Sequence, residues 1–168
     1  MKVNRLKYLS ISVLLMCNFT AKSAQVKVTV NSLNIMIDSR IELLNIIQYL
    51  GDYNLLNNYS CQYKNDINLF FGEYKNDEAV TFFRELAQNG FNYDAPVNVI
   101  LYLSDSFNIT QNIPEELVKR AGDQDKLGKF FTLCRKFSEK TNFYSFFEKH
   151  KISYHSLLDS VTSHLKKF

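Results

Sequence analysis

Two kinds of hydrophobic spacing follow one another along the chain. From Gln25 to Val30 apolar residues alternate with polar ones, which is typical of a half-buried β-strand. After that, apolar residues recur at three- and four-residue spacing almost to the C-terminus, which is typical of amphipathic helices. A strand needs a partner for its backbone groups, so either residues 34–37 fold back on it or the partner lies outside the chain. The pattern predicts a mainly α, multi-helix domain with one short N-terminal β-strand or hairpin.

The densest apolar run after the N-terminal segment spans residues 40–50, with the sequence RIELLNIIQYL. Asp38 or Ser39 suits the N-cap of a helix here, and Glu42 is placed for a capping box with Ser39. Gly51 suits the C-terminal stop. The apolar residues lie on several faces, so we expect this helix to be buried on most sides. At roughly 1.5–3 kcal/mol per large buried side chain, it should dominate the stability of the domain.

The remaining helices are predicted by spacing and by capping residues. They lie at residues 65–74, 78–88 and 114–120, at a segment capped by Asp123, at a segment capped by Thr141, and from Ser153 to the C-terminus. Residues 52–64 and 104–113 are expected to be connections. Residues 97–103 fit either a helix, because Asp94 and Pro96 suit a helix start, or a β-rich strand; we favour the helix.

The first 23 residues have the pattern of a secretory signal peptide. Lys2, Arg5 and Lys7 precede a short apolar segment, residues 8–19, and small residues occupy the −3 and −1 positions of a cut before Ala24. The apolar segment is too short to span a membrane. This pattern predicts export, so that the protein is secreted or periplasmic.

A lipoprotein is a less favoured alternative for the same segment. Cys17 would be the acylated residue, but Met16 stands where such a site has Gly, Ala or Ser. We therefore expect residues 1–23 to be removed as a signal peptide and residues 24–168 to form one helical domain, with no transmembrane segment left after cleavage.

Removal of the leader changes the charge balance. The whole chain carries 20 basic and 17 acidic residues, but four basic and no acidic residues lie in the leader, which leaves 16 against 17. The basic pI therefore gives no argument for nucleic acid binding. Residues 24–113 hold 5 basic and 10 acidic groups, and residues 114–168 hold 11 and 7. The two halves could attract each other, or the C-terminal face could meet an acidic partner; we favour ordinary solvated helix faces.

Two cysteines remain after cleavage, Cys61 and Cys134. An exported compartment permits a disulfide between them. Cys134 falls on an apolar helical stripe, however, which favours a buried free thiol. Both alternatives stay open on the sequence.

The sequence contains no complete catalytic or metal-binding pattern. Its histidines are His150, His155 and His164, and no two of them have the four-residue spacing of adjacent helical turns. His155 and Asp159 share a helix face, which leaves an enzyme as a remote option. The acidic pairs 115–116 and 123–125 lie in predicted first helical turns, where capping explains them.

Four pairs of phenylalanines could line a carbohydrate or peptide groove: Phe70-Phe71, Phe82-Phe83, Phe130-Phe131 and Phe146-Phe147. Their helical spacing favours core packing instead. HExxH, GxSxG, P-loop and dinucleotide motifs are absent from the sequence. We assign no catalytic, cofactor-binding or metal-binding residue, and we expect no cofactor.

Short segments resemble, in the same order, the N-terminal region of a family of uncharacterised secreted bacterial proteins. Members of that family are longer and carry a zincin-type HExxH helix further on, which implies a metallopeptidase. No metal ligand or general base of the family has a counterpart in this sequence. The segments are Asp38-Ser39-Arg40-Ile41-Glu42-Leu43-Leu44 through Gln48-Tyr49-Leu50, Tyr63-Lys64-Asn65-Asp66-Ile67 with Phe70-Phe71, Tyr74-Lys75-Asn76, and Phe91-Asn92-Tyr93-Asp94-Ala95-Pro96.

Two functions follow as expectations. The first is the N-terminal helical region of a zincin-like protein that lacks the catalytic motif, as in a truncated or split gene, and is not catalytic by itself. The second is a self-contained secreted binding module, such as an inhibitor or pseudoenzyme partner. Its protein partner would dock on the C-terminal helix, where the apolar stripe from Val161 to Phe168 is still intact at the end of the sequence.

Overall fold

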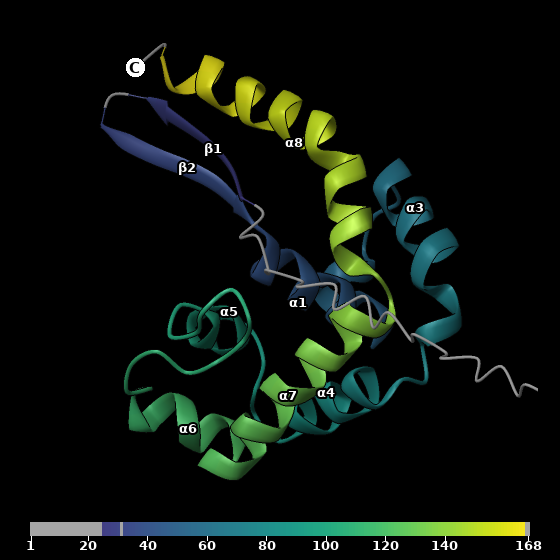
Figure 1. Cartoon of the computed structure of the whole chain (residues 1–168), viewed down its shortest axis with the longest axis vertical. Coiled ribbons are helices and arrows are strands. Elements are labelled where there is room, and N and C mark those ends of the chain that lie inside the picture. The colour runs from purple at the N-terminus through teal and green to yellow at the C-terminus, as the bar shows by residue number, and fades with distance from the viewer. Residues whose placement is uncertain (1–24, 31, 167–168) are drawn as a thin grey trace, which may run out of the picture.

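The computed structural model describes residues 25–30 and 32–166 and confirms a mainly α fold (Figure 1). The predicted signal peptide, including Cys17, lies outside the described residues. In chain order the elements are β1 (Gln25–Val30), β2 (Leu33–Asp38), α1 (Ser39–Leu50), α2 (Asn54–Asn57), α3 (Gln62–Phe71), the 3-10 helix η1 (Gly72–Tyr74), α4 (Glu78–Gln88), α5 (Ala95–Ile100), α6 (Glu115–Ala121), α7 (Gln124–Lys140) and α8 (Phe143–Leu165).

The N-terminal strand finds its partner within the chain. β1 and β2 pair antiparallel, with Val26 opposite Ile37 and Val28 opposite Ile35. Val26 and Val30 are buried, and Val28, Ile35 and Ile37 are half-buried, because the hairpin packs mainly on α8. Leu33, opposite Val30 at the end of the hairpin, stays exposed. Of the two alternatives left by the sequence, the fold-back of residues 34–37 is therefore the correct one.

Helix α1 lies at the centre of the other helices and packs against α4, α5, α7 and α8. Asp38 is its N-cap, and the carboxylate accepts a hydrogen bond from the backbone N–H of Arg40 at 2.8 Å. Gly51 ends the helix and donates its N–H to Ile47 O. The buried face is the predicted one: Leu43, Leu44, Ile46, Ile47 and Leu50.

The capping box expected from Ser39 and Glu42 is wrong. With Asp38 as the cap, Glu42 is not at the third helical position, and its carboxylate instead accepts a hydrogen bond from the hydroxyl of Tyr63. A contact with a residue 21 positions away replaces the local one.

The last two predicted helices are one. α8 runs without interruption from Phe143 to Leu165, so the break expected at Ser153 is wrong. Its segment contains neither glycine nor proline, and nothing in it stops helix propagation. Thr141 is the C-cap of α7 rather than the N-cap of the next helix, and Asn142, with φ +52°, makes the turn between them.

The structure also corrects the prediction for residues 52–64 and decides between helix and strand for the segment that begins at residue 97. The connection expected at residues 52–64 contains the short α2 and the start of α3 at Gln62. Residues 97–100 are helical, as favoured, within α5. Leu103 then leaves the helix and forms an isolated β-bridge with Ile109, which holds the following loop as a closed turn.

Aromatic side chains from α3, α4, α7 and α8 fill the core. Phe71 contacts the rings of Phe137 and Phe146, and Phe83 contacts Phe130. The interpretation of the paired phenylalanines as core residues is confirmed, with Phe70 alone among them packing at the half-buried margin.

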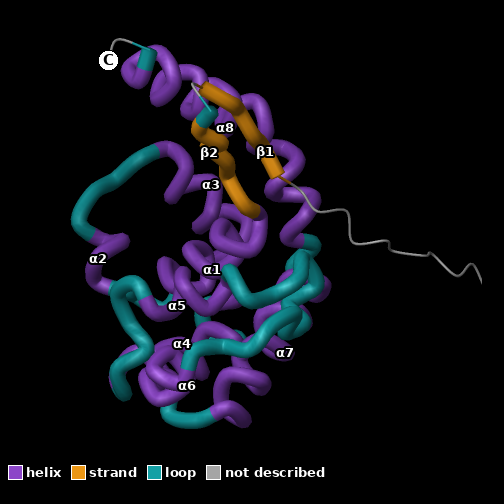
Figure 2. Tube along the Cα trace, turned by 90° about the vertical axis from the view of Figure 1, so that its left-hand side faces the viewer, coloured by secondary structure: helices purple, strands orange, loops and turns teal. Residues whose placement is uncertain are grey.

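The molecule has two regions of different construction (Figures 1 and 2). We call the hairpin together with residues 151–165 of α8 the arm, and the remaining helices the body. Figure 1 shows the arm extending beyond the body, with the hairpin alongside the outer part of α8. Among the helices of residues 25–30 and 32–166, none is both long and apolar enough to cross a membrane.

Candidate functional site

Exposed apolar side chains gather on the arm. Six of the twelve large hydrophobic residues that are exposed in the described structure belong to it, although the arm is much smaller than the body. They are Leu33, Met36, Ile152, Leu157, Val161 and Leu165. Single exposed apolar residues are normal on any protein, but a concentration of them marks an interaction surface.

Three of these residues form a continuous row on α8. Leu157, Val161 and Leu165 follow one another at four-residue spacing, which places them in one line along the helix. They are 58 %, 40 % and 37 % exposed. The neighbouring row, Tyr154, Leu158 and Thr162, is buried against the hairpin. One apolar row of the helix is therefore covered and the next is open to solvent; we call the open one the α8 row.

The groups around the α8 row are mainly polar. His155 and His164 are exposed on the same part of the helix, and Lys166 follows its end. Asp159 is the acidic residue of this segment, and its backbone carbonyl accepts hydrogen bonds from Thr162 and Ser163. A polar rim around an apolar row is the composition of a protein interface.

A polar network joins the arm to the body where α1, α3 and α8 meet. The Tyr63 hydroxyl donates to the Glu42 carboxylate and lies 2.6 Å from the Tyr154 hydroxyl. Close by, the His150 ring contacts Asp66 Oδ2 through Nε2 at 3.2 Å and the Phe146 carbonyl through Nδ1 at 2.9 Å. These side chains orient α8 just before it leaves the body.

Burial controls the protonation of this network. Desolvation raises the pKa of Glu42, and the Tyr63 hydrogen bond and the nearby His150 only partly offset it. Burial beside that carboxylate also raises the pKa of Tyr63 and of Tyr154 above the ordinary tyrosine range. Both hydroxyls therefore keep their protons and stay available as hydrogen-bond donors.

The residues considered from sequence as candidate chemistry do not come together. His150 lies in the network, whereas His155, His164 and Asp159 are exposed on the arm. Glu115 and Asp123 lie in the first turn or at the cap of their helices, as predicted, and Asp123 caps α7 by accepting from Lys126 N. Within the described ranges, no group of three or more His, Cys, Asp or Glu side chains is arranged to hold a metal ion.

Both cysteines of the described chain are free thiols. Cys61 is exposed at the start of α3, and Cys134 is buried in α7, as its place on the apolar stripe predicted. Burial raises the pKa of the Cys134 thiol, so it remains protonated and unreactive.

Three members of the junction network were missed by the sequence argument: Glu42, Tyr63 and Asp66. The sequence predicts Glu42 as part of a capping box and places Tyr63 in a connection. Their partners lie 21, 91 and 84 positions away along the chain, so local spacing carries no signal for these contacts.

Comparison of the chain with protein families, with curated proteins and with solved structures finds no match.

Proposed function

We propose that the protein is an exported, non-catalytic interaction module whose arm binds a partner protein. The observation that carries this proposal is the α8 row, an apolar line of Leu157, Val161 and Leu165 that stays exposed beside a covered row of the same helix. Export is proposed from the leader pattern, with cleavage before Ala24.

The partner element proposed for this row is an amphipathic helix. A straight ridge of side chains at four-residue spacing fits the groove between two ridges of another helix. Burial of three aliphatic side chains that are now half-exposed supplies the apolar centre of such an interface.

The test compares two leucines of equal exposure. Leu157 in the α8 row and Leu101 in the body are both 58 % exposed. A photo-crosslinking residue is placed at either position in the mature chain, which is then incubated with the exported proteins of the source cells. We expect one defined adduct from position 157 and none from position 101. The adduct should be lost when Val161→Lys is added. Equal labelling at both positions would contradict the proposal.

A second copy of this chain is another outcome of the same experiment. Light scattering of the mature protein distinguishes it, because an adduct with twice the protomer mass and a dimer in solution would place a self-association surface on the arm instead.

The ordered resemblance supports a second proposal, that the chain corresponds to the N-terminal helical region of a longer zincin-like architecture. Under this proposal the partner of the chain is a zincin-type domain that is encoded in the neighbouring genomic sequence. It is tested by reading the neighbouring genomic sequence for an HExxH-coding frame, and by metal analysis of the purified mature chain. Stoichiometric zinc retained after dialysis, or proteolysis by the chain alone, would contradict it.

A further inference from the structure

The body contains a cavity that lies away from the α8 row. It has a volume of about 500 Å³ and lies between the loop that follows α5 and the corner where α7 turns into α8. Carbon contributes most of the surface that lines it. This volume falls in the range of small-molecule sites, about 300–1,000 Å³. The lining residues are Asp105, Ser106, Phe107, Arg135, Ser138, Glu139, Asn142 and Tyr144.

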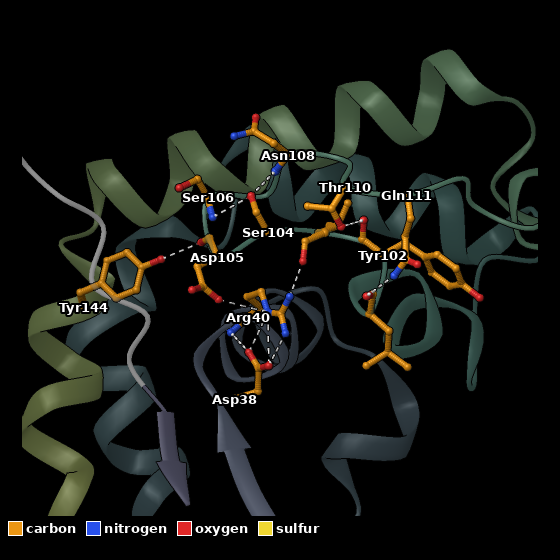
Figure 3. Close-up of polar contacts among 12 residues, drawn as sticks. Asp38, Arg40, Tyr102, Ser104, Asp105, Ser106, Asn108, Thr110, Gln111 and Tyr144 are labelled. Atoms are coloured by element: carbon orange, nitrogen blue, oxygen red, sulfur yellow. Dashed lines mark hydrogen bonds and ion pairs between the residues drawn. The ribbon is translucent and has the colours of Figure 1, made fainter.

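The loop wall of the cavity is held in place by Arg40 (Figure 3). The Arg40 guanidinium donates to both carboxylate oxygens of Asp38, at 3.0 Å and 2.5 Å, and to the carbonyl of Leu103. It also lies 3.8 Å from Asp105 Oδ1. Burial alone would raise the pKa of Asp38, but the hydrogen bonds and charge of Arg40 lower it below its usual value, so the pair stays ionised.

Further hydrogen bonds fix the rest of that wall. Tyr144 donates its hydroxyl to the carbonyl of Asp105 at 3.2 Å, which ties the loop to α8. The Ser104 hydroxyl accepts from the backbone N–H groups of Ser106 and Asn108 at 3.3 and 3.2 Å. The wall is therefore preorganised, which lowers the entropic cost of binding.

Two lining residues adopt left-handed backbone conformations. Phe107 has φ +58° and Asn142 has φ +52°. Asparagine tolerates this region, but for a bulky phenylalanine it costs of order 1–3 kcal/mol. Phe107 is nevertheless buried, and it lines the cavity.

The charges inside the cavity are not neutralised by each other. Arg135 and Glu139 are four residues apart on α7, a spacing at which opposite charges normally pair. Instead, Arg135 donates through Nη1 to the neutral amide oxygen of Asn108 at 3.0 Å. Among the described residues, the Glu139 carboxylate has no hydrogen bond or ion pair. The guanidinium of Arg135 and the carboxylates of Glu139 and Asp105 thus line the same space, and Asp105 has Arg40 at 3.8 Å as its charged neighbour.

A smaller cavity shows the contrast. It has a volume of about 280 Å³ and is lined in part by Asp94 and Arg120. There the guanidinium Nη1 and the carboxylate Oδ1 are 2.9 Å apart, so the charges satisfy one another. The Glu116 carboxylate also lines this smaller cavity, but its lining cation, Arg120, is already paired. The larger cavity offers a ligand both a carboxylate and a guanidinium that is not paired with a carboxylate.

We propose that the larger cavity binds a small zwitterion with an apolar side chain, either a free α-amino acid or a dipeptide. Arg135 takes the carboxylate, because a guanidinium fork matches two carboxylate oxygens. Glu139 takes the ammonium group. The apolar side chain lies against Phe107 and the ring of Tyr144. The two charges of the ligand thus meet side chains that have no oppositely charged partner in the cavity.

The experiment titrates the isotope-labelled mature chain with phenylalanine and with leucyl-phenylalanine, and follows the amide signals of residues 105–108 and 135–144. We expect saturable shifts confined to these residues. N-acetyl-phenylalaninamide, which has the same side chain and no charge, should bind at least about tenfold more weakly, because it loses both charge-assisted contacts. The zwitterion that binds more strongly shows whether the cavity takes a single amino acid or a dipeptide.

Matched variants assign the two charges. Arg135→Gln and Glu139→Gln should each weaken binding by about tenfold or more. Lys136→Gln and Asp125→Asn, which change exposed charges of the same helix that do not line the cavity, should leave it unchanged. Equal binding of the neutral amide, shifts spread outside these residues, or equal effects of all four variants would overturn the proposal. None of these outcomes bears on the α8 row, so this inference and the proposed function fail independently.

Discussion

The helices of the body and of the arm have apolar residues at the same three- and four-residue spacing. The two regions differ in how much of this apolar surface is buried. In the body, the apolar faces of α1, α3, α4 and α7 and the start of α8 close on one another, and α1 has five fully buried aliphatic side chains. In the arm, one helix meets one hairpin. The hairpin covers one row of α8 and leaves the α8 row without a partner within the arm.

The body and the arm differ in how many elements pack around each helix, and not in the kind of side chain that the helices carry. Leu157 and Leu158 are adjacent and chemically identical, yet one is 58 % exposed and the other is buried. A two-stranded hairpin is marginal by itself and depends on the helix behind it. We therefore expect the arm to open at a lower free energy than the body.

The largest effect is expected from a truncation in the body. Phe71 is fully buried, and its ring contacts Phe70, Phe137 and Phe146 at centroid distances of 4.8, 6.1 and 4.9 Å. Phe71→Ala should lower the free energy of unfolding by about 3–5 kcal/mol, because three elements lose a shared contact. Urea unfolding measures this loss. The control is Leu69→Ala on the same helix, where the side chain is 86 % exposed and the change should be close to neutral.

The next effect separates the arm from the body. Leu158→Ala truncates a buried side chain of α8, the helix on which the hairpin packs, and should cost about 2–3 kcal/mol. Hydrogen exchange should then accelerate at the amides of β1 and β2, while those of α1 keep their protection. Leu157→Ala is the control. Equal acceleration in both regions would mean that the arm and the body unfold as one unit.

The same comparison explains how far the sequence could predict this structure. The alternation of residues 25–30 and the three- and four-residue spacing of the helices depend on local geometry, and both were found. The prediction of a separate helix from Ser153 is wrong, because a serine that suits an N-cap does not end a helix whose segment contains no helix-breaking residue. The junction network and the cavity were missed because their residues lie tens of positions apart and meet only after the helices pack.

A smaller effect is expected at the junction between the two regions. Tyr154→Phe keeps the ring of this residue and removes the hydroxyl that lies 2.6 Å from Tyr63. The loss of one hydrogen bond should lower the free energy of unfolding by about 1 kcal/mol. Exchange should accelerate in the arm more than in the body, because the network orients α8 where it leaves the body. Tyr59→Phe, at an exposed tyrosine, should change neither quantity.

The smallest effect concerns Glu42 and depends on pH. Burial raises the pKa of this carboxyl above its ordinary 4.5, so the folded state keeps a proton that the unfolded chain has already released. Stability should therefore fall as pH rises from about 4.5 through the raised pKa, and then stay level. Asp38 acts in the opposite sense, because its lowered pKa removes stability only as pH falls below its ordinary 3.8. The two contributions thus occupy different pH windows.

Glu42→Gln separates the contribution of Glu42 from that of Asp38. The amide oxygen still accepts the hydrogen bond from Tyr63 but no longer titrates. The variant should match or exceed the wild type in stability at neutral pH, and the difference between them should shrink as pH falls toward 4.5. Denaturant unfolding across this window measures the difference. A difference that stays constant with pH would show that Glu42 is already ionised in the folded protein, and that the junction between arm and body holds a charge that burial does not suppress.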